Sequence, residues 1–188
     1  MNINEKQICM DGENACKGMG IDRKACEEIV HQLRRAYCDE WLAFIQYWTA
    51  AQVVKGLARP DAACELMEHA NEELEHARKL ADRIQTLCGE IPISPPEILE
   101  NCNCAFVAPS DPCTYRIMCQ SIASERCAIA VYKRILKMIG DRDPVTSRMI
   151  LEILEDEEEH EYEFRQIKED IDASREALGM GRNQEKKD

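Results

Sequence analysis

Four stretches of this 188-residue chain carry apolar side chains at alternating spacings of three and four residues. This spacing is typical of helices that bury one face in a bundle. It predicts helices over residues 22–58, 61–87, 112–139 and 143–178, with core-facing seams that run over 33–54, 66–87, 118–139 and 150–171. Asp22 and Asp61 are placed to cap the first two helices, and Asp143 followed by Pro144 opens the fourth. The sequence therefore predicts an all-α fold.

The connections between these helices are short, long and short. Residues 90–112 hold five of the seven prolines and form a long connection, whereas the other two links are only a few residues. Short links force neighbouring helices to run antiparallel, and a long one can cross the length of a bundle. We expect an antiparallel four-helix bundle over residues 21–178, with one long crossover between the second and third helices. Residues 1–20 are expected to be an irregular arm and residues 179–188 a flexible tail.

Each seam is apolar except near its middle, where a glutamate interrupts it. The four glutamates are Glu40, Glu73, Glu125 and Glu157. On the second and fourth helices a histidine follows three residues later, as His76 and His160, on the same helical face. Four carboxylates in one apolar core would lose hydration at a cost of several kcal/mol per charge unless cations neutralise them. Two divalent ions would balance the four charges, and mixed oxygen and imidazole ligation suits iron or manganese.

Less specific interpretations exist for each of these residues. Glu157, Glu158 and Glu159 form an acidic run that is also typical of a solvated helix face. The second helix offers a rival set of metal-binding side chains in Glu65, Glu68 and His69. The coincidence of four mid-seam glutamates with two Glu-x-x-His pairs on alternate helices favours the di-metal interpretation.

Composition limits the classes of function. The 24 basic and 36 acidic residues give a net charge of −12, which argues against direct binding to DNA. No long apolar stretch predicts a membrane helix, and no basic-then-apolar start predicts a signal peptide, so a cytoplasmic location is expected. None of the eleven cysteines forms a C-x-x-C pair, so rubredoxin and zinc-ribbon sites lack their signature. The odd number argues against a fully paired disulfide scaffold and favours mostly buried thiols.

Two segments resemble the helical signatures of bacterioferritins, within the ferritin-like di-iron carboxylate proteins. They are the run from Glu40 to Tyr47 and the run from Leu154 to His160, and the likeness covers roughly residues 25–172. The resemblance implies a ferritin-like fold in which Glu73 and Glu157 bridge two iron ions. It makes Glu40 and Glu125 terminal ligands and gives each iron one histidine. The same resemblance places Tyr47 and Tyr132 behind the ligands.

The sequence departs from bacterioferritins at the position of their haem-ligating methionine. That position is Leu74, so no haem is expected, and nothing after Leu178 predicts the short fifth helix of 24-subunit ferritins. Both departures, together with Cys102 and Cys127, resemble the Dps-like proteins called thioferritins. Those combine a di-iron site with a nearby cysteine pair in a twelve-subunit cage. Cys104 is an alternative partner for Cys127.

The resemblance implies a ferroxidase that oxidises Fe(II), preferring hydrogen peroxide to O2, and stores the Fe(III) as mineral to protect against oxidative stress. It implies two iron ions per subunit, with manganese as the alternative metal, in a hollow homo-oligomer, expected to be a dodecamer. Any protection of DNA would be indirect. Two enzymes on the same scaffold are rivals, namely a rubrerythrin-like peroxidase without iron storage and a manganese catalase. A purely structural helical bundle is the non-enzymatic rival.

Overall fold

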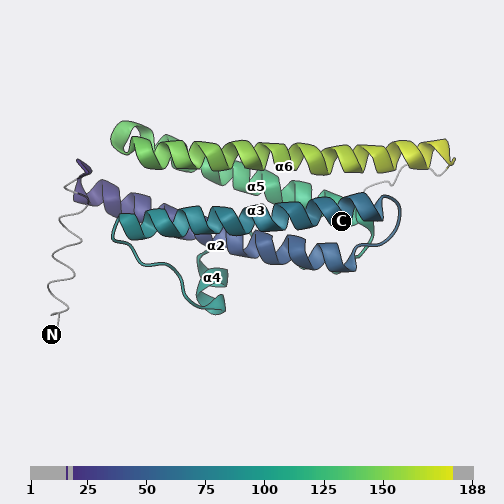
Figure 1. Ribbon diagram of the computed structural model, residues 1–188, viewed down its shortest axis with the longest axis horizontal. Helices are drawn as coiled ribbons and strands as arrows, with labels where there is room; N and C mark the ends of the chain where they lie inside the picture. Colours follow the sequence, from purple (N-terminus) through teal and green to yellow (C-terminus); the bar gives the residue numbers. More distant parts are fainter. Residues whose placement is uncertain (1–15, 17–18, 180–188) are drawn as a thin grey trace.

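Four long helices lie side by side in the computed structural model, which describes Cys16 and residues 19–179 (Figure 1). The helices are α2 (Arg23–Val53), α3 (Arg59–Thr86), the short α4 (Pro95–Asn101), α5 (Thr114–Ile139) and α6 (Pro144–Ala177), with a 3-10 turn η1 (Gly140–Arg142) before α6. The predicted all-α fold is confirmed. Among the described helices, none is both long and apolar enough to cross a membrane. Most of the predicted arm and tail lie outside the described residues.

The helices pack in two antiparallel pairs, α2 with α3 and α5 with α6, and the pairs meet through α2 with α5 and α3 with α6. The long crossover joins α3 to α5 and runs along α2. It starts at Gly89, whose backbone packs against Val30 near the beginning of α2, and it ends at Cys113, which bridges to Lys55 just beyond the end of α2. The crossover also contains α4, a helix that the sequence pattern did not predict (Figure 1).

Helix α2 ends at Val53, earlier than the predicted Ala58. The backbone of Lys55 explains the difference, because its N–H donates to Pro112 O at 2.7 Å and its carbonyl accepts from Thr114 N at 2.9 Å. This bridge requires extended backbone, and Gly56, with φ of +110°, then makes the turn. Helix α3 accordingly begins at Arg59, so the predicted cap Asp61 lies inside its first turn.

The core is divided into two apolar clusters by the level at which the four glutamates lie. One cluster lies toward the start of α2 and includes Leu33, Leu80, Ile135 and Ile153. The other lies toward the end of α2 and includes Ala51, Leu66, Met118 and Phe164. Most residues of the predicted seams are fully buried. The exceptions are half-buried: Phe44, Ile129, Leu136 and Ile167.

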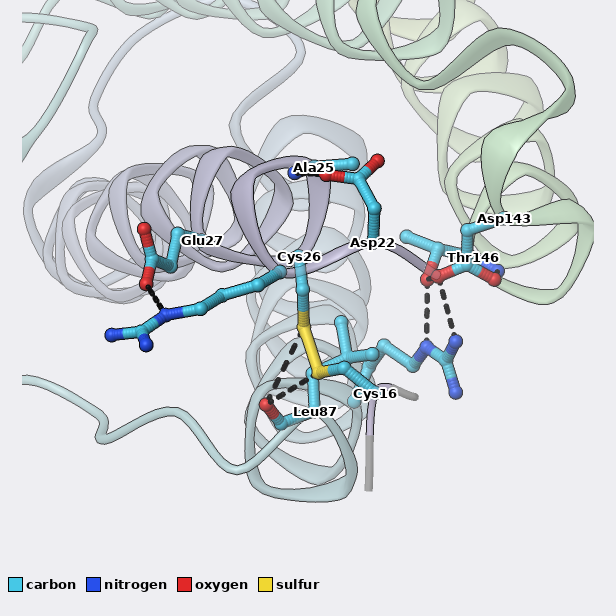
Figure 2. The surroundings of a disulfide bond; sticks show 10 residues. Cys16, Asp22, Ala25, Cys26, Glu27, Leu87, Asp143 and Thr146 are labelled. Atoms are coloured by element: carbon cyan, nitrogen blue, oxygen red, sulfur yellow. Dashed lines mark hydrogen bonds and ion pairs between the residues drawn. A yellow bond between two sulfur atoms is a disulfide. The ribbon is translucent and has the colours of Figure 1, made fainter. Parts of the chain in front are cut away.

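Two disulfides occur in the described part of the chain and use four of its cysteines, which agrees with the expectation that the chain is not a fully paired disulfide scaffold. One disulfide joins Cys16 to Cys26 and holds the described end of the N-terminal segment against the first turn of α2 (Figure 2). Its sulfur atoms lie 3.6 and 3.8 Å from the carbonyl oxygen of Leu87. The other joins Cys104 to Cys127. Cys38, Cys64, Cys88, Cys102 and Cys113 are free thiols.

Asp143 fastens the start of α6 to α3. Its carboxylate caps α6 by accepting from Thr146 N at 3.1 Å and pairs with Arg83 at 2.7 Å. Asp143 and Thr146 lie side by side at the start of α6 (Figure 2). Burial alone would raise the pKa of Asp143, but the hydrogen bonds from Thr146 and Arg83 outweigh it and hold that pKa below its usual value. The charged carboxylate therefore stabilises the fold above pH 4, and this contribution is lost as the pH falls through the lowered pKa.

We predict that Asp143→Ala lowers the free energy of unfolding by about 2 kcal/mol at pH 7, because the cap and the buried ion pair are both removed. Asp141→Ala is the matched control, since Asp141 is exposed in the preceding turn. Thermal unfolding followed by circular dichroism, at one protein concentration, measures both variants. Equal melting temperatures for the two, or a deficit that does not shrink on acidification, would contradict the prediction.

Candidate metal centre

The four mid-seam glutamates meet at the centre of the bundle, each from a different long helix. Their side chains and those of His76 and His160 are at most 2% exposed. They form two groups whose potential ligand atoms lie within 4.8 Å of one another. The first group is Glu40, Glu73, His76 and Glu157, and the second is Glu73, Glu125, Glu157 and His160. Glu73 and Glu157 belong to both groups, which is the arrangement that two bridged metal ions require.

Each histidine turns its Nδ1 toward this centre. Nδ1 of His76 lies 3.2 Å from Glu73 and 3.3 Å from Glu157. Nδ1 of His160 lies 3.4 Å from Glu73.

The outer nitrogens meet acidic side chains from the facing helix. Nε2 of His76 lies 3.0 Å from Asp156, and Nε2 of His160 lies 2.7 Å from Glu72. A carboxylate at Nε2 fixes the proton there, so the lone pair of Nδ1 faces the position of a metal ion. Neither Asp156 nor Glu72 was predicted. Their position next to the ligands on exposed helix faces gives no distinctive signal in the sequence.

Two buried tyrosines hold the two glutamates that are not shared between the groups, Glu40 of the first group and Glu125 of the second. Tyr47 donates a hydrogen bond to Glu125 at 2.5 Å, and Tyr132 donates one to Glu40. Burial and the neighbouring carboxylates raise the pKa of both tyrosines well above the usual value, so both hydroxyl groups stay protonated and act as donors. The structure thus places Tyr47 and Tyr132 directly behind Glu125 and Glu40.

Without metal, protons must balance part of the charge. Burial, followed by the charges of Glu157 and Glu73, holds the pKa of Glu125 well above its usual range. For His160, burial alone would lower the pKa, but contacts with Glu73, Glu157 and Glu72 raise it to about 9. The carboxylates around His76 likewise overcome the effect of its burial and raise its pKa. The metal-free centre therefore carries protons on its two histidines at neutral pH, and the raised pKa of Glu125 favours the protonated form of that carboxyl group.

The donor atoms fit two divalent ions. Several of them are buried without a hydrogen-bond partner, namely Glu40 Oε2, Glu73 Oε1, Glu157 Oε1 and His160 Nδ1. Buried polar atoms are rarely left without a partner, and metal coordination is one way to supply it. Four carboxylates and two imidazoles supply hard and intermediate ligands of the kind that iron and manganese prefer.

The disulfide beside the centre involves Cys104 rather than Cys102. Cys127 lies two residues beyond Glu125 on α5 and is bonded to Cys104 in the crossover. Cys102 is a free thiol whose Sγ lies 3.3 Å from Leu99 O. The pairing of Cys102 with Cys127 is therefore wrong in this structure, and the alternative that the sequence left open holds.

Asp39 connects this disulfide to the centre. Its buried carboxylate accepts hydrogen bonds from Cys104 N at 2.8 Å and from Asn103 N at 2.6 Å. Asp39 directly precedes Glu40 in the chain. A cavity of about 20 Å³ lies between Cys104, Gln46 and Glu125 on the α2/α5 side of the bundle. Since a water molecule needs about 10–15 Å³ of such space, this cavity admits one small molecule beside the carboxylates.

Comparison with known proteins bears on what this centre does. The model of the ferritin-like domain family matches residues 30–174. A protein of Pyrococcus furiosus called DNA protection during starvation protein is 32% identical over 151 residues, 79% of each chain. A solved dodecameric thioferritin, the bacterioferritin-related protein of Bacteroides fragilis, superposes with a TM-score of 0.82 and 32% identity, covering 93% of this chain and 99% of that one. The Desulfovibrio desulfuricans bacterioferritin, at 20% identity and a TM-score of 0.68, covers 86% and 95% and shares the fold.

We predict that binding of a divalent metal at pH 7 releases protons, because the ions replace the protons on His160 and His76. The raised pKa values belong to the metal-free protein, so protons compete with the metal until the pH exceeds those values. The apparent affinity for the metal should therefore increase with pH up to about pH 9. Calorimetric titration of the metal-free protein with Mn²⁺, in buffers of different ionisation enthalpy, counts the protons released. Heats that do not depend on the buffer would contradict this description of the centre.

Proposed function

Because this chain belongs to the ferritin-like family, we propose that its centre binds two Fe(II) ions and oxidises them. The observation that carries the proposal is the sharing of Glu73 and Glu157 between two ligand groups, each completed by one further glutamate and one histidine. That set supplies four negative charges for two divalent ions. Manganese is the alternative metal, because the same ligands suit it.

When bound, two Fe(II) ions supply one electron each, which matches the two-electron reduction of hydrogen peroxide to water. The protein residues prepare the site for this chemistry. Tyr47 and Tyr132 fix the orientation of Glu125 and Glu40. Asp156 and Glu72 fix the two imidazole rings. The two apolar clusters on either side exclude bulk water, so the charges act in a medium of low polarity.

We propose that the oxidant approaches from the α2/α5 side, where the small cavity lies against Glu125 and Cys104. Its volume of about 20 Å³ suits a small oxidant such as hydrogen peroxide or O2. Preference for peroxide remains part of the proposal, and it rests on the match between two ferrous ions and a two-electron acceptor.

The proposed fate of the product is storage as ferric mineral inside a hollow homo-oligomer. The likeness to a dodecameric thioferritin over nearly the whole chain supports twelve subunits. Removal of Fe(II) and peroxide together would protect the cell from oxidative stress, and the net charge of −12 favours an indirect effect on DNA.

We predict that the metal-free assembly, loaded anaerobically with excess Fe(II) and treated with peroxide, retains far more iron than its dinuclear centres hold. Iron is counted on the intact assembly after gel filtration. Retention that stops at the capacity of the centres would instead support a di-iron peroxidase without storage.

Glu73→Ala should slow the initial oxidation about 100-fold or more, because both ions lose a shared ligand. Glu75→Ala, an exposed change on the same helix, is the control and should keep the wild-type rate.

We further propose that Cys104 and Cys127 are a redox pair linked to the centre. Cys104 lines the small cavity and is bonded to Cys127, and the hydrogen bond between Cys104 N and Asp39 joins the crossover to the residue before Glu40. Opening the disulfide would free the crossover from α5 at this point. The pair would then supply two electrons or control access of the oxidant.

We predict that peptide mapping of the peroxide-treated protein finds the Cys104–Cys127 linkage, and that Cys104→Ser abolishes it. Cys102→Ser is the matched control, since Cys102 lies two residues away in the same crossover and should leave the linkage intact. Mass spectrometry after alkylation of free thiols distinguishes the two variants. A Cys102–Cys127 peptide in the wild-type protein would contradict the assignment.

A further inference from the structure

Gln46 is a buried amide beside the dinuclear centre to which the metal ligation gives no role. It lies on α2, directly before Tyr47, and is 3% exposed. It lines the small cavity of about 20 Å³, together with Cys104 of the crossover and Glu125 of α5. A glutamine amide carries an acceptor oxygen and a donor nitrogen, and in a buried position each of them needs a partner.

The crossover fixes the orientation of this amide. The backbone N–H of Val107 donates a hydrogen bond to Oε1 of Gln46 at 3.2 Å. Only an oxygen can accept from an N–H group, so the side-chain nitrogen cannot take that position. Val107 is held in turn by Gln120 on α5, whose Nε2 donates to its carbonyl oxygen at 2.5 Å. The oxygen of Gln46 is therefore committed to the crossover.

The nitrogen of the same amide is left without a partner. Nε2 of Gln46 is buried and makes no hydrogen bond to any of the described residues. A buried N–H group in this state is uncommon, because it has lost its water and gained nothing in return. Gln46 lines the cavity, whereas Val107 does not. Since the oxygen is directed at Val107, Nε2 is the polar atom that Gln46 can present to a molecule in the cavity.

The rest of the cavity wall determines which molecules suit this donor. Its other oxygen-bearing side chains are four carboxylates and two hydroxyl groups, namely Asp39, Glu40, Glu125, Glu157, Tyr47 and Ser124. Carboxylates accept hydrogen bonds and repel anions. The hydroxyl group of Tyr47 is already donated to Glu125. A wall of acceptors with one unused amide donor suits a small neutral molecule that both accepts and donates hydrogen bonds.

We propose that Gln46 binds the oxidant, by donating a hydrogen bond from Nε2 to an oxygen atom of hydrogen peroxide held in the cavity. The peroxide molecule donates its own protons to acceptors of the wall. O2 is a weak acceptor and has no proton to donate, so it leaves Nε2 without a partner and is bound less well. Gln46 is thus a specificity-determining residue that favours peroxide over O2. This inference rests on the proposed ferroxidase function, because it concerns the oxidant of that same reaction.

Kinetics with two oxidants test the proposal on the Fe(II)-loaded full-length assembly. We expect Gln46→Met, which removes the donor from a side chain of similar length, to raise KM for hydrogen peroxide about tenfold. The initial rate with O2 should change by less than about twofold, because O2 uses the donor little. Gln46→Glu keeps an oxygen for Val107 N but replaces the donor with an acceptor, so it should also raise KM for peroxide.

Gln120→Leu is the matched control, because it removes the other hydrogen bond that holds Val107 and leaves the amide of Gln46 in place. It should keep the wild-type KM for peroxide. A second measurement needs neither a variant nor turnover. Crystals of the wild-type protein loaded with Zn²⁺, which cannot reduce peroxide, are soaked in hydrogen peroxide. We expect electron density for a two-atom molecule in the cavity, within hydrogen-bond distance of Gln46 Nε2.

A wild-type KM for peroxide in Gln46→Met would overturn the proposal. So would an equal rise of KM in Gln120→Leu, since Gln46 would then act only through the position of the crossover. The soaked crystals separate these outcomes from failure of the proposed function. If peroxide lies at Nε2 but wild-type protein oxidises no Fe(II), the ferroxidase proposal fails and the binding site stands. If peroxide oxidises Fe(II) normally but the soaked cavity holds none at Nε2, the proposal for Gln46 fails and the ferroxidase stands.

Discussion

The structure depends on the neutralisation of four carboxylates that a helical bundle buries at one level of its core. A single unpaired charge in that position is costly, and four would repel one another strongly. In the metal-free protein the raised pKa values of His76 and His160 put protons there, and the raised pKa of Glu125 favours its neutral form. If the centre binds cations as we predict, the exchange of protons for metal would couple it to pH.

Rigidity around the centre comes from residues that never touch the metal positions. The two apolar clusters fix the helices above and below, while Tyr47 and Tyr132 each reach across the bundle to a glutamate on another helix. Asp156 and Glu72 extend this support to the partly exposed surface between α3 and α6.

Helical periodicity predicted most of the fold and the meeting of six side chains at its centre, because a glutamate that replaces an apolar residue at the middle of a seam is visible in one helix at a time. Features that depend on two distant segments were not visible in this way. The early end of α2 follows from the bridge between Lys55 and the start of α5. The choice of Cys104 over Cys102 depends on how Asp39 holds the crossover backbone. His69, a rival in the sequence, proved to lie beside the centre rather than in it.

The small cavity beside Cys104 and an acidic hollow lined by Glu72, Glu159 and Glu163 lie on opposite faces of the bundle, one between α2 and α5 and the other between α3 and α6. Under the proposed function, a neutral oxidant and a divalent cation would have separate routes to the same carboxylates. Neither reagent would then have to wait for the other to leave a shared channel, and the acidic wall would not repel an uncharged molecule that arrives on the other side. The two reagents would meet only at the carboxylates in the middle of the bundle.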